Sequence, residues 1–153
     1  MSAYKKILVA VDGSPAAQRG LREAIRLARS QRARLFIVHV VNEFMAYNYL
    51  ESMAIGTDVR AVLREAGRKI LERAQAEARK QGVKAATVMR EIVGGAAAGP
   101  IVREARKLGA DLIVLGTHGR RGVRRLVLGS DAEQVVRTAT VPVLLVRGKS
   151  PRR

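Results

Sequence analysis

The sequence predicts an α/β protein with a doubly wound, five-stranded parallel sheet and helices on both faces. Two observations predict it. Five short, mainly apolar segments recur along the chain, and those at Ile7–Val11, Leu112–Leu115 and Val143–Val146 are continuous, which is typical of parallel strands buried on both faces. Segments with helical spacing of apolar residues separate these runs, as expected for the crossover helices that parallel strands require.

The first apolar run, Ile7–Val11, is followed by a turn and an amphipathic helix. Ser14 is expected to cap the helix and Pro15 to occupy its first position. The expected buried face consists of Ala17, Leu21, Ala24, Ile25 and Ala28. Arginines dominate the opposite face, so this helix is expected to cover one side of the sheet.

The second strand, Leu35–Val41, leads into a long irregular segment, Asn42–Thr57, expected to lie on the body of the protein or to act as a lid or partner contact. A long helix over Val59–Gln81 should end at Gly82. Its expected apolar stripe is Val62, Leu63, Ala66, Ile70, Ala74 and Ala78. The later elements are a strand at Ala86–Val93, a short helix opened by Pro100, a strand at Leu112–Leu115, a helix from about Ser130 and a last strand at Val143–Val146.

Length and composition favour one globular domain over residues 1–153, with its core at about 4–147. Of the 153 residues, 48% are hydrophobic and none is cysteine, which excludes disulfides and thiolate metal sites. The two histidines, His39 and His118, are far apart, so no metal site of the protein's own is expected. No apolar run has the length of a membrane span or of a signal peptide, so we expect a cytoplasmic protein with no membrane partner.

The chain is strongly basic. Twenty-nine Lys and Arg residues against thirteen Asp and Glu give a formal net charge of +16. Such a charge attracts polyanions, including nucleotides and nucleic acids. The alternative is a basic surface that is simply solvated.

The most informative segment runs from Gly116 to Ser130. Gly116 closes the fourth strand, Gly119 follows after two residues, and Gly129 precedes Ser130 where a helix begins. Glycines let backbone N–H groups approach a phosphate closely, and a helix N-terminus favours an anion. Arginines between these glycines, Arg120 among them, add positive charge. A P-loop and a Gly-x-Gly-x-x-Gly fingerprint are both missing.

This Gly-x2-Gly-x9-Gly-Ser pattern resembles the ATP-binding motif of the universal stress protein family. Three further features agree with the family: the Val-Asp-Gly-Ser turn after the first strand, His39-Val40-Val41 at the end of the second, and the final Pro-Val-Leu-Leu-Val strand. The resemblance covers roughly Lys5 to Arg147.

The resemblance implies the strand order 3-2-1-4-5, a Rossmann-like fold and a bound adenine nucleotide, ATP in first place, with Mg²⁺ as an optional companion. The implied nucleotide-binding residues are Ala10, Val11, Asp12, Val40, Gly116, Gly119, Gly129 and Ser130. Further candidates for phosphate contacts are His118, Arg120 and Asp131. A homodimer is expected through the apolar edge strand formed by Val143, Leu144, Leu145 and Val146.

Several of these residues have alternative structural roles. Asp12 can satisfy N–H groups of its own turn, and Ser130 with Glu133 can form a capping box. Gly116 and Gly119 can serve tight turns alone, and His118 can be an ordinary loop residue. Asp131 departs from the family pattern, which has a small apolar residue there, and it would repel phosphates if it faced the ligand.

Two functions follow from the sequence. The first is a nucleotide-binding regulatory protein of the stress response with little or no rapid turnover, because no paired nucleophile and base is visible. Slow ATP hydrolysis stays open. The alternative is a basic protein that binds nucleic acid or other polyanions electrostatically, weakly and without sequence specificity.

Overall fold

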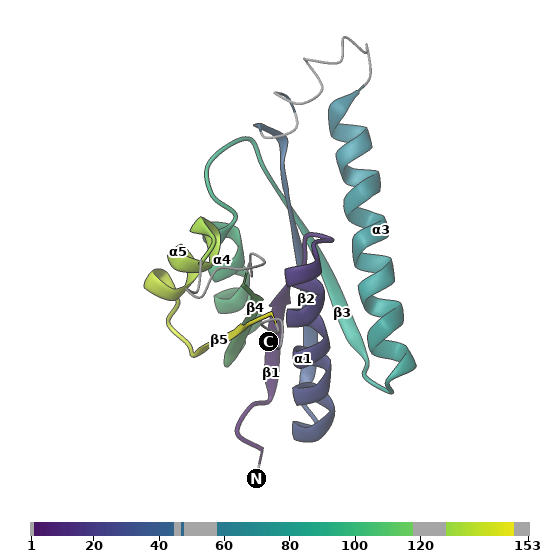
Figure 1. The fold of residues 1–153 in the computed structure, drawn as a ribbon, viewed down its shortest axis with the longest axis vertical. Helices are drawn as coiled ribbons and strands as arrows, with labels where there is room; N and C mark the ends of the chain where they lie inside the picture. The colour runs from purple at the N-terminus through teal and green to yellow at the C-terminus, as the bar shows by residue number, and fades with distance from the viewer. Residues whose placement is uncertain (1, 45–46, 48–57, 118–127, 149–153) are drawn as a thin grey trace, which may run out of the picture.

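The structure is a computed structural model that describes residues 2–44, 47, 58–117 and 128–148. Its centre is a sheet of five parallel strands in the order β3-β2-β1-β4-β5, which confirms the predicted fold and strand order (Figure 1). The strands are β1 (Lys6–Ala10), β2 (Arg34–Asn42), β3 (Ala85–Ile92), β4 (Leu112–Gly116) and β5 (Val143–Val146). They agree with the sequence-based boundaries to within one residue.

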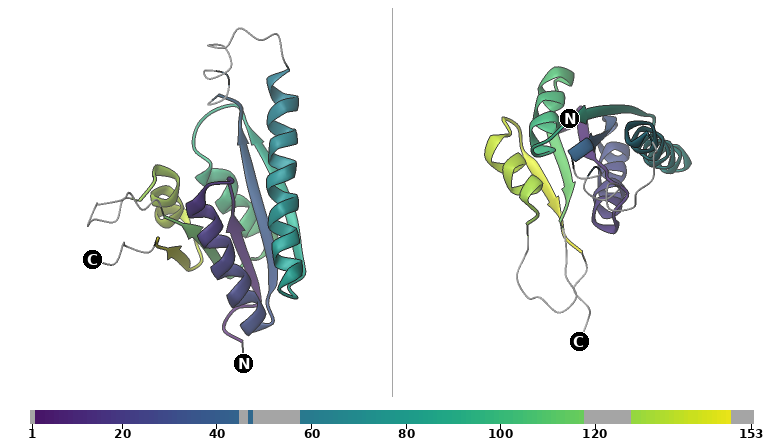
Figure 2. Two further views of the ribbon diagram at one scale, coloured as in Figure 1. Left: turned by 45° about the vertical axis from the view of Figure 1, so that its right-hand side comes forward. Right: turned by 90° about the horizontal axis from the view of Figure 1, so that it is seen from above.

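Helices cover both faces of the sheet (Figure 2). Helices α1 (Pro15–Gln31) and α3 (Val59–Lys80) pack on one face, and α4 (Ala98–Leu108) and α5 (Ser130–Thr138) on the other. Alternate residues of each strand therefore enter different cores. In β1, Ile7 and Val9 face α1 and α3, while Leu8 faces α4 and α5. This two-sided burial explains why the central strands β1 and β4 are continuous apolar runs in the sequence.

The start of α1 follows the sequence-based prediction. Ser14 Oγ accepts a hydrogen bond from Ala17 N at 3.1 Å, and Pro15 occupies the first helical position. The five residues predicted to form the buried face are all buried.

The predicted stripe of α3 is partly wrong. Val62 is 45% exposed and Ala66 is exposed, whereas Gly67 and Leu71 are buried. Gly67 faces the sheet, and the imidazole of His39 fills the space that a side chain at position 67 would need. A Cβ on Gly67 would lie 2.8 Å from His39 Cδ2, so this contact is open only to glycine.

The start of α4 differs from prediction, whereas α5 begins at Ser130 as expected. Helix α4 begins at Ala98, two residues before Pro100, which lies in its first turn. The N-cap of α5 is Gly129, so Ser130 is the first helical residue and makes no side-chain capping bond. The predicted capping box of Ser130 and Glu133 is therefore wrong.

Most of the segment Asn42–Thr57 lies outside the described residues, so its predicted roles are not addressed. Its first residues are anchored to the fold. Glu43 is buried and pairs with Arg60, with Oε2 2.9 Å from Nε. None of the helices in the described part of the chain combines the length and apolar character that a bilayer span requires.

Helix α1 approaches β4 unusually closely, and two glycines make this possible. A Cβ on Gly116 would stand 1.8 Å from the carbonyl oxygen of Ala16, and a Cβ on Gly20 would stand 2.8 Å from Gly116 N. The glycine at 116 is therefore a requirement of helix packing. This contact holds the start of α1 beside the end of β4, where a ligand site of a parallel sheet is expected.

We expect Gly116→Ala to lower the free energy of unfolding by about 3 kcal/mol, the upper part of the range for overpacked sites, because the backbone of α1 must move away. Gly20→Ala should cost less, since alanine gains helix propensity of about 1 kcal/mol. Gly94→Ala is the control, because a Cβ there meets nothing within 4 Å. Urea denaturation measures all three, and equal stability of the Gly116 and Gly94 variants would contradict the packing role.

Candidate functional site

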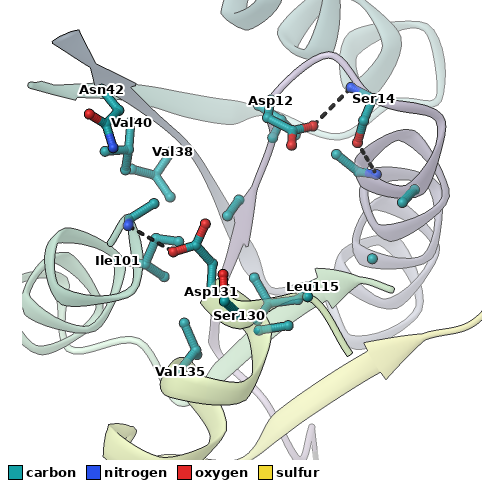
Figure 3. A pocket seen from close by; sticks show the side chains of 18 residues that line it. Asp12, Ser14, Val38, Val40, Asn42, Ile101, Leu115, Ser130, Asp131 and Val135 are labelled. Atoms are coloured by element: carbon teal, nitrogen blue, oxygen red, sulfur yellow. Dashed lines mark hydrogen bonds between the residues drawn. The ribbon is translucent and has the colours of Figure 1, made fainter. Parts of the chain in front are cut away.

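A pocket of about 330 Å³ opens at the carboxyl ends of the central strands (Figure 3). The chain runs from β1 outwards to β3, and α4 then carries it back to β4 on the other side of β1. Loops therefore leave β1 and β4 in opposite directions, and a crevice remains between them. Ligands of open α/β sheets bind at such a point.

The pocket brings together most of the residues singled out from the sequence. Those that line it are Ala10, Val11, Asp12, Val40, Gly116, Gly129, Ser130 and Asp131. The other three candidates, His118, Gly119 and Arg120, lie outside the described residues.

Sequence reasoning missed the walls contributed by the interiors of β2 and β4 and by α4 and α5. These residues are Val38, Ile101, Leu115, Ala132 and Val135. Asn42 and Ala97 also line the pocket, and they lie in segments at the end of β2 and after β3 where the sequence predicts ligand contacts. The available signal was topological: the segment before α4 follows the end of β3 and returns over the sheet, so its first helical turn borders the crevice.

The inner part of the pocket is apolar. Val38 and Val40 come from β2, Ile101 from α4, Leu115 from β4 and Val135 from α5, as Figure 3 shows. Side chains from four elements thus form a slot with no charged group at its base. Such a slot suits a flat, weakly polar ring system.

Three helices begin at the rim of this pocket: α1, α4 and α5. In α5 the first helical hydrogen bond runs from Glu133 N to Gly129 O at 3.0 Å. Within the described part of the chain, the N–H groups of Ser130, Asp131 and Ala132 therefore have no partner. Free N–H groups and the positive ends of the helix dipoles make this rim favourable to an anion.

Asp12 is exposed and shapes the turn between β1 and α1. Its Oδ1 accepts a hydrogen bond from Ser14 N at 2.8 Å, as the structural alternative predicted. No described residue donates to Oδ2. The carboxylate can thus hold the turn with one oxygen and accept a ligand hydroxyl with the other.

Asp131 is turned towards the start of α4. Its Oδ1 accepts a hydrogen bond from Ala97 N at 2.9 Å, joining the N-terminal ends of α4 and α5 (Figure 3). The side chain is therefore held at the pocket rim. It places a negative charge where the helix ends would otherwise attract an anion.

His39 supports the pocket from the opposite face of the sheet. Its Nδ1 lies 2.8 Å from the carbonyl oxygen of Val11, and a carbonyl can only accept, so Nδ1 carries the hydrogen. Val11 N in turn donates to Val38 O at 2.9 Å, which extends the β1–β2 pairing to the pocket. The backbone that bears Asp12 is fixed by these bonds.

Among the described residues, no group of three or more His, Asp or Glu side chains is placed to hold a metal ion. In the described part of the pocket, the polar groups include two carboxylates, backbone N–H groups, the amide of Asn42 and the hydroxyl groups of Ser14 and Ser130.

The sequence model of the universal stress protein family matches residues 3–147. The universal stress protein YxiE of Bacillus subtilis is 35% identical over 151 residues, covering 94% of this chain and 99% of that protein. A crystal structure of a universal stress protein family member from Burkholderia pseudomallei has a TM-score of 0.73 at 37% identity, covering 95% of this chain and 98% of the other.

Two further similar structures contain nucleotides. The universal stress protein of Archaeoglobus fulgidus in complex with dAMP has a TM-score of 0.65 at 25% identity, covering 94% of this chain and 98% of the other. A universal stress protein in complex with cAMP has a TM-score of 0.61 at 26% identity, covering 95% and 98%. The fold, the pocket position and these matches agree: this chain belongs to the universal stress protein family.

Proposed function

We propose that this protein is a regulatory adenine-nucleotide-binding protein. The observation that carries the proposal is the pocket at the β1–β4 crevice, which joins an apolar slot to the N-terminal ends of three helices. The apolar slot suits an adenine ring, and the helix N-terminal ends suit a phosphate. The dAMP and cAMP complexes of similar proteins support the same class of ligand.

In this proposal the adenine ring occupies the slot beside Val40, and the ribose lies near Asp12, whose free Oδ2 can accept a ribose hydroxyl. The phosphate approaches Gly129 and Ser130 at the start of α5. Gly119, His118 and Arg120 of the family motif remain predicted phosphate contacts. ATP, with or without Mg²⁺, remains a predicted ligand.

We propose no rapid turnover. Asp12 holds its own turn through one oxygen, Asp131 is held by Ala97 N, and neither is paired with a nucleophile in the described part of the pocket. The protein would act as a regulator whose nucleotide-bound and nucleotide-free forms differ. The cytoplasmic location expected from the sequence stays a prediction.

The first test is binding itself. Mass spectrometry of small molecules released on denaturation should detect an adenine nucleotide, and calorimetry should measure AMP and ATP binding. Ala10→Leu should weaken AMP binding at least about tenfold, because a larger side chain at this pocket position takes the space of the ring.

The matched control for this test is Ala76→Leu, which adds the same side chain to an exposed position of α3. It should leave AMP affinity unchanged. If Ala10→Leu binds AMP as well as the unaltered protein does, the nucleotide does not occupy this pocket.

Asp131 should disfavour ligands with more phosphates. Asp131→Asn removes the charge and keeps an oxygen that can accept from Ala97 N. We expect ATP affinity to rise about threefold to tenfold and AMP affinity to rise less, since charge repulsion at ~6 Å and an effective dielectric of about 20 is worth ~3 kcal/mol before screening.

Glu133→Gln is the control for Asp131→Asn, because Glu133 lies in the same helical turn, is exposed and pairs with Arg137 at 2.7 Å. It should not change either affinity. Titration calorimetry with both nucleotides measures the difference. A loss of Mg-ATP affinity in Asp131→Asn would mean instead that Asp131 helps to hold a metal bridging the phosphates.

We also propose a homodimer through β5. Within the described part of the chain this strand pairs with β4 alone, and its four residues are only half-buried. Pro142 O accepts a hydrogen bond from Ile113 N in β4, and Val146 O accepts one from Thr117 N just after β4. Because successive residues of a strand point their backbone groups to opposite sides, the N–H groups of Val143 and Leu145 face outwards. They can pair with a second copy of the strand.

Leu145→Pro removes an outward N–H that β4 does not use, so it should convert a dimer into a monomer while the fold remains. Light scattering at micromolar concentration in moderate salt measures the mass, and circular dichroism checks the fold. A monomeric unaltered protein, or a folded dimeric variant, would contradict the proposed interface.

A further inference from the structure

The end of the sheet opposite the pocket carries a row of cations at the strand starts. It is the lower end of β1, β2 and β3 in Figure 1. Lys5 and Lys6 stand at the start of β1, Arg34 begins β2, and Lys84 directly precedes β3. Lys6 pairs in register with Arg34, and Leu35 with Ala85. Three neighbouring strands, each ~4.8 Å from the next, therefore begin with a positive charge.

The helices end at the same level and add more cations. In a parallel α/β fold every crossover helix runs back to the strand starts. The cation in the last turn of α5, Arg137, is paired with Glu133. The last turns of α1, α3 and α4 and the connections after them also reach this end. They contribute Arg29, Arg32, Arg79, Lys80, Arg106 and Lys107, all of them exposed. We call the strand-start and helix-end cations together the basic face.

Little negative charge compensates the basic face. In segments 2–6, 29–34, 79–84 and 106–111 the only carboxylate is Asp111, whose two oxygens accept hydrogen bonds from Lys5 N at 2.9 Å and Lys6 N at 3.1 Å. Within the described residues no cation of this face forms an ion pair. On α3, by contrast, the cations Arg60, Arg64 and Arg68 are each paired with a glutamate.

Compensation of helix dipoles explains only part of this distribution. Cations in a last helical turn stabilise the helix end. Among the strand-start cations, Lys6 also serves a helix end, because its Nζ donates to Leu108 O at 3.0 Å in the last turn of α4. The strand starts give no such reason for Lys5, Arg34 and Lys84, since β-strands have only small net dipoles. An array of unpaired charges on neighbouring strands and helices is the pattern of a surface that contacts a row of phosphates.

We propose that the basic face binds the phosphate backbone of double-stranded DNA without sequence specificity. A lipid surface fits less well, because the exposed large apolar side chains among the described residues (Phe44, Tyr47, Val62, Val93 and Val136) all lie in other segments. Single strands fit less well because the described part of the basic face has no exposed aromatic side chain on which bases could stack.

The test is fluorescence anisotropy with a labelled 20-base-pair duplex of arbitrary sequence, measured between 50 and 200 mM KCl. The triple variant Arg29→Gln, Lys84→Gln, Lys107→Gln removes charge from two helix ends and one strand start. At 100 mM KCl its affinity should fall at least about tenfold, and the slope of log K against log salt should shrink by ~2–3, since each lost phosphate contact contributes about 0.9.

The control triple variant, Arg22→Gln, Lys69→Gln, Arg103→Gln, removes the same net charge from exposed positions in the middle of α1, α3 and α4. It should weaken the complex less than about threefold. Both variants should bind AMP as the unaltered protein does, which separates this inference from the proposed nucleotide site.

The proposal would be overturned by equal loss of affinity in both triple variants, by no duplex binding of the unaltered protein at 50 mM KCl, or by binding to vesicles with 30% phosphatidylserine in place of the duplex. Tighter binding of a 20-base single strand than of the duplex would also contradict it.

Discussion

The close contact between α1 and β4 is the constraint on which the pocket depends. Gly116 packs directly against the carbonyl group of Ala16, at a place where any side chain would collide with it. Gly20 lets the backbone of α1 come close to the same strand. Arg19 extends this contact, with Nη2 donating to Thr117 O at 3.2 Å. Because α1 is pressed onto β4, its first turn and the end of β4 become two walls of one crevice. Gly116, a glycine of the family motif, therefore has a packing role that does not depend on a ligand.

The sequence predicted the sheet well because two-sided burial leaves a direct record in composition: Ile7–Val9 and Leu112–Leu115 are apolar at every position. The order of the strands came from the family resemblance, since apolar runs carry no information on neighbours. The stripe of α3 was mispredicted because hydrophobicity does not mark Gly67 as a contact residue. Its burial is set by the ring of His39, which lies in a strand 28 residues away.

The same distinction applies to the pocket. Residues that follow a strand directly, such as Asp12, could be singled out from local spacing and are at the pocket rim. Ile101 could not, because it reaches the pocket only when α4 crosses over the sheet. The hydrogen bond from Ala97 N to Asp131 joins residues 34 positions apart, and no local pattern announces it. The expected capping box failed for a similar reason: the chain reaches α5 with Gly129, and not Ser130, in the capping conformation.

The parallel topology gives the molecule two ends that differ in the source of their positive charge. The N-terminal ends of α1, α4 and α5 gather at the pocket, where backbone N–H groups favour an anion and Asp131 adds a negative charge. Helix C-terminal ends gather at the basic face, where side-chain charges supply the attraction. From Lys6 at the basic face to Asp12 at the pocket the chain advances six residues, about 20 Å at ~3.3 Å per residue. The Debye length at physiological salt is only about 8 Å, so charge bound at one end is screened from the other. Nucleotide binding and polyanion binding are therefore expected to be electrostatically independent, and any coupling between them would have to pass through the sheet itself or through a second copy of the chain.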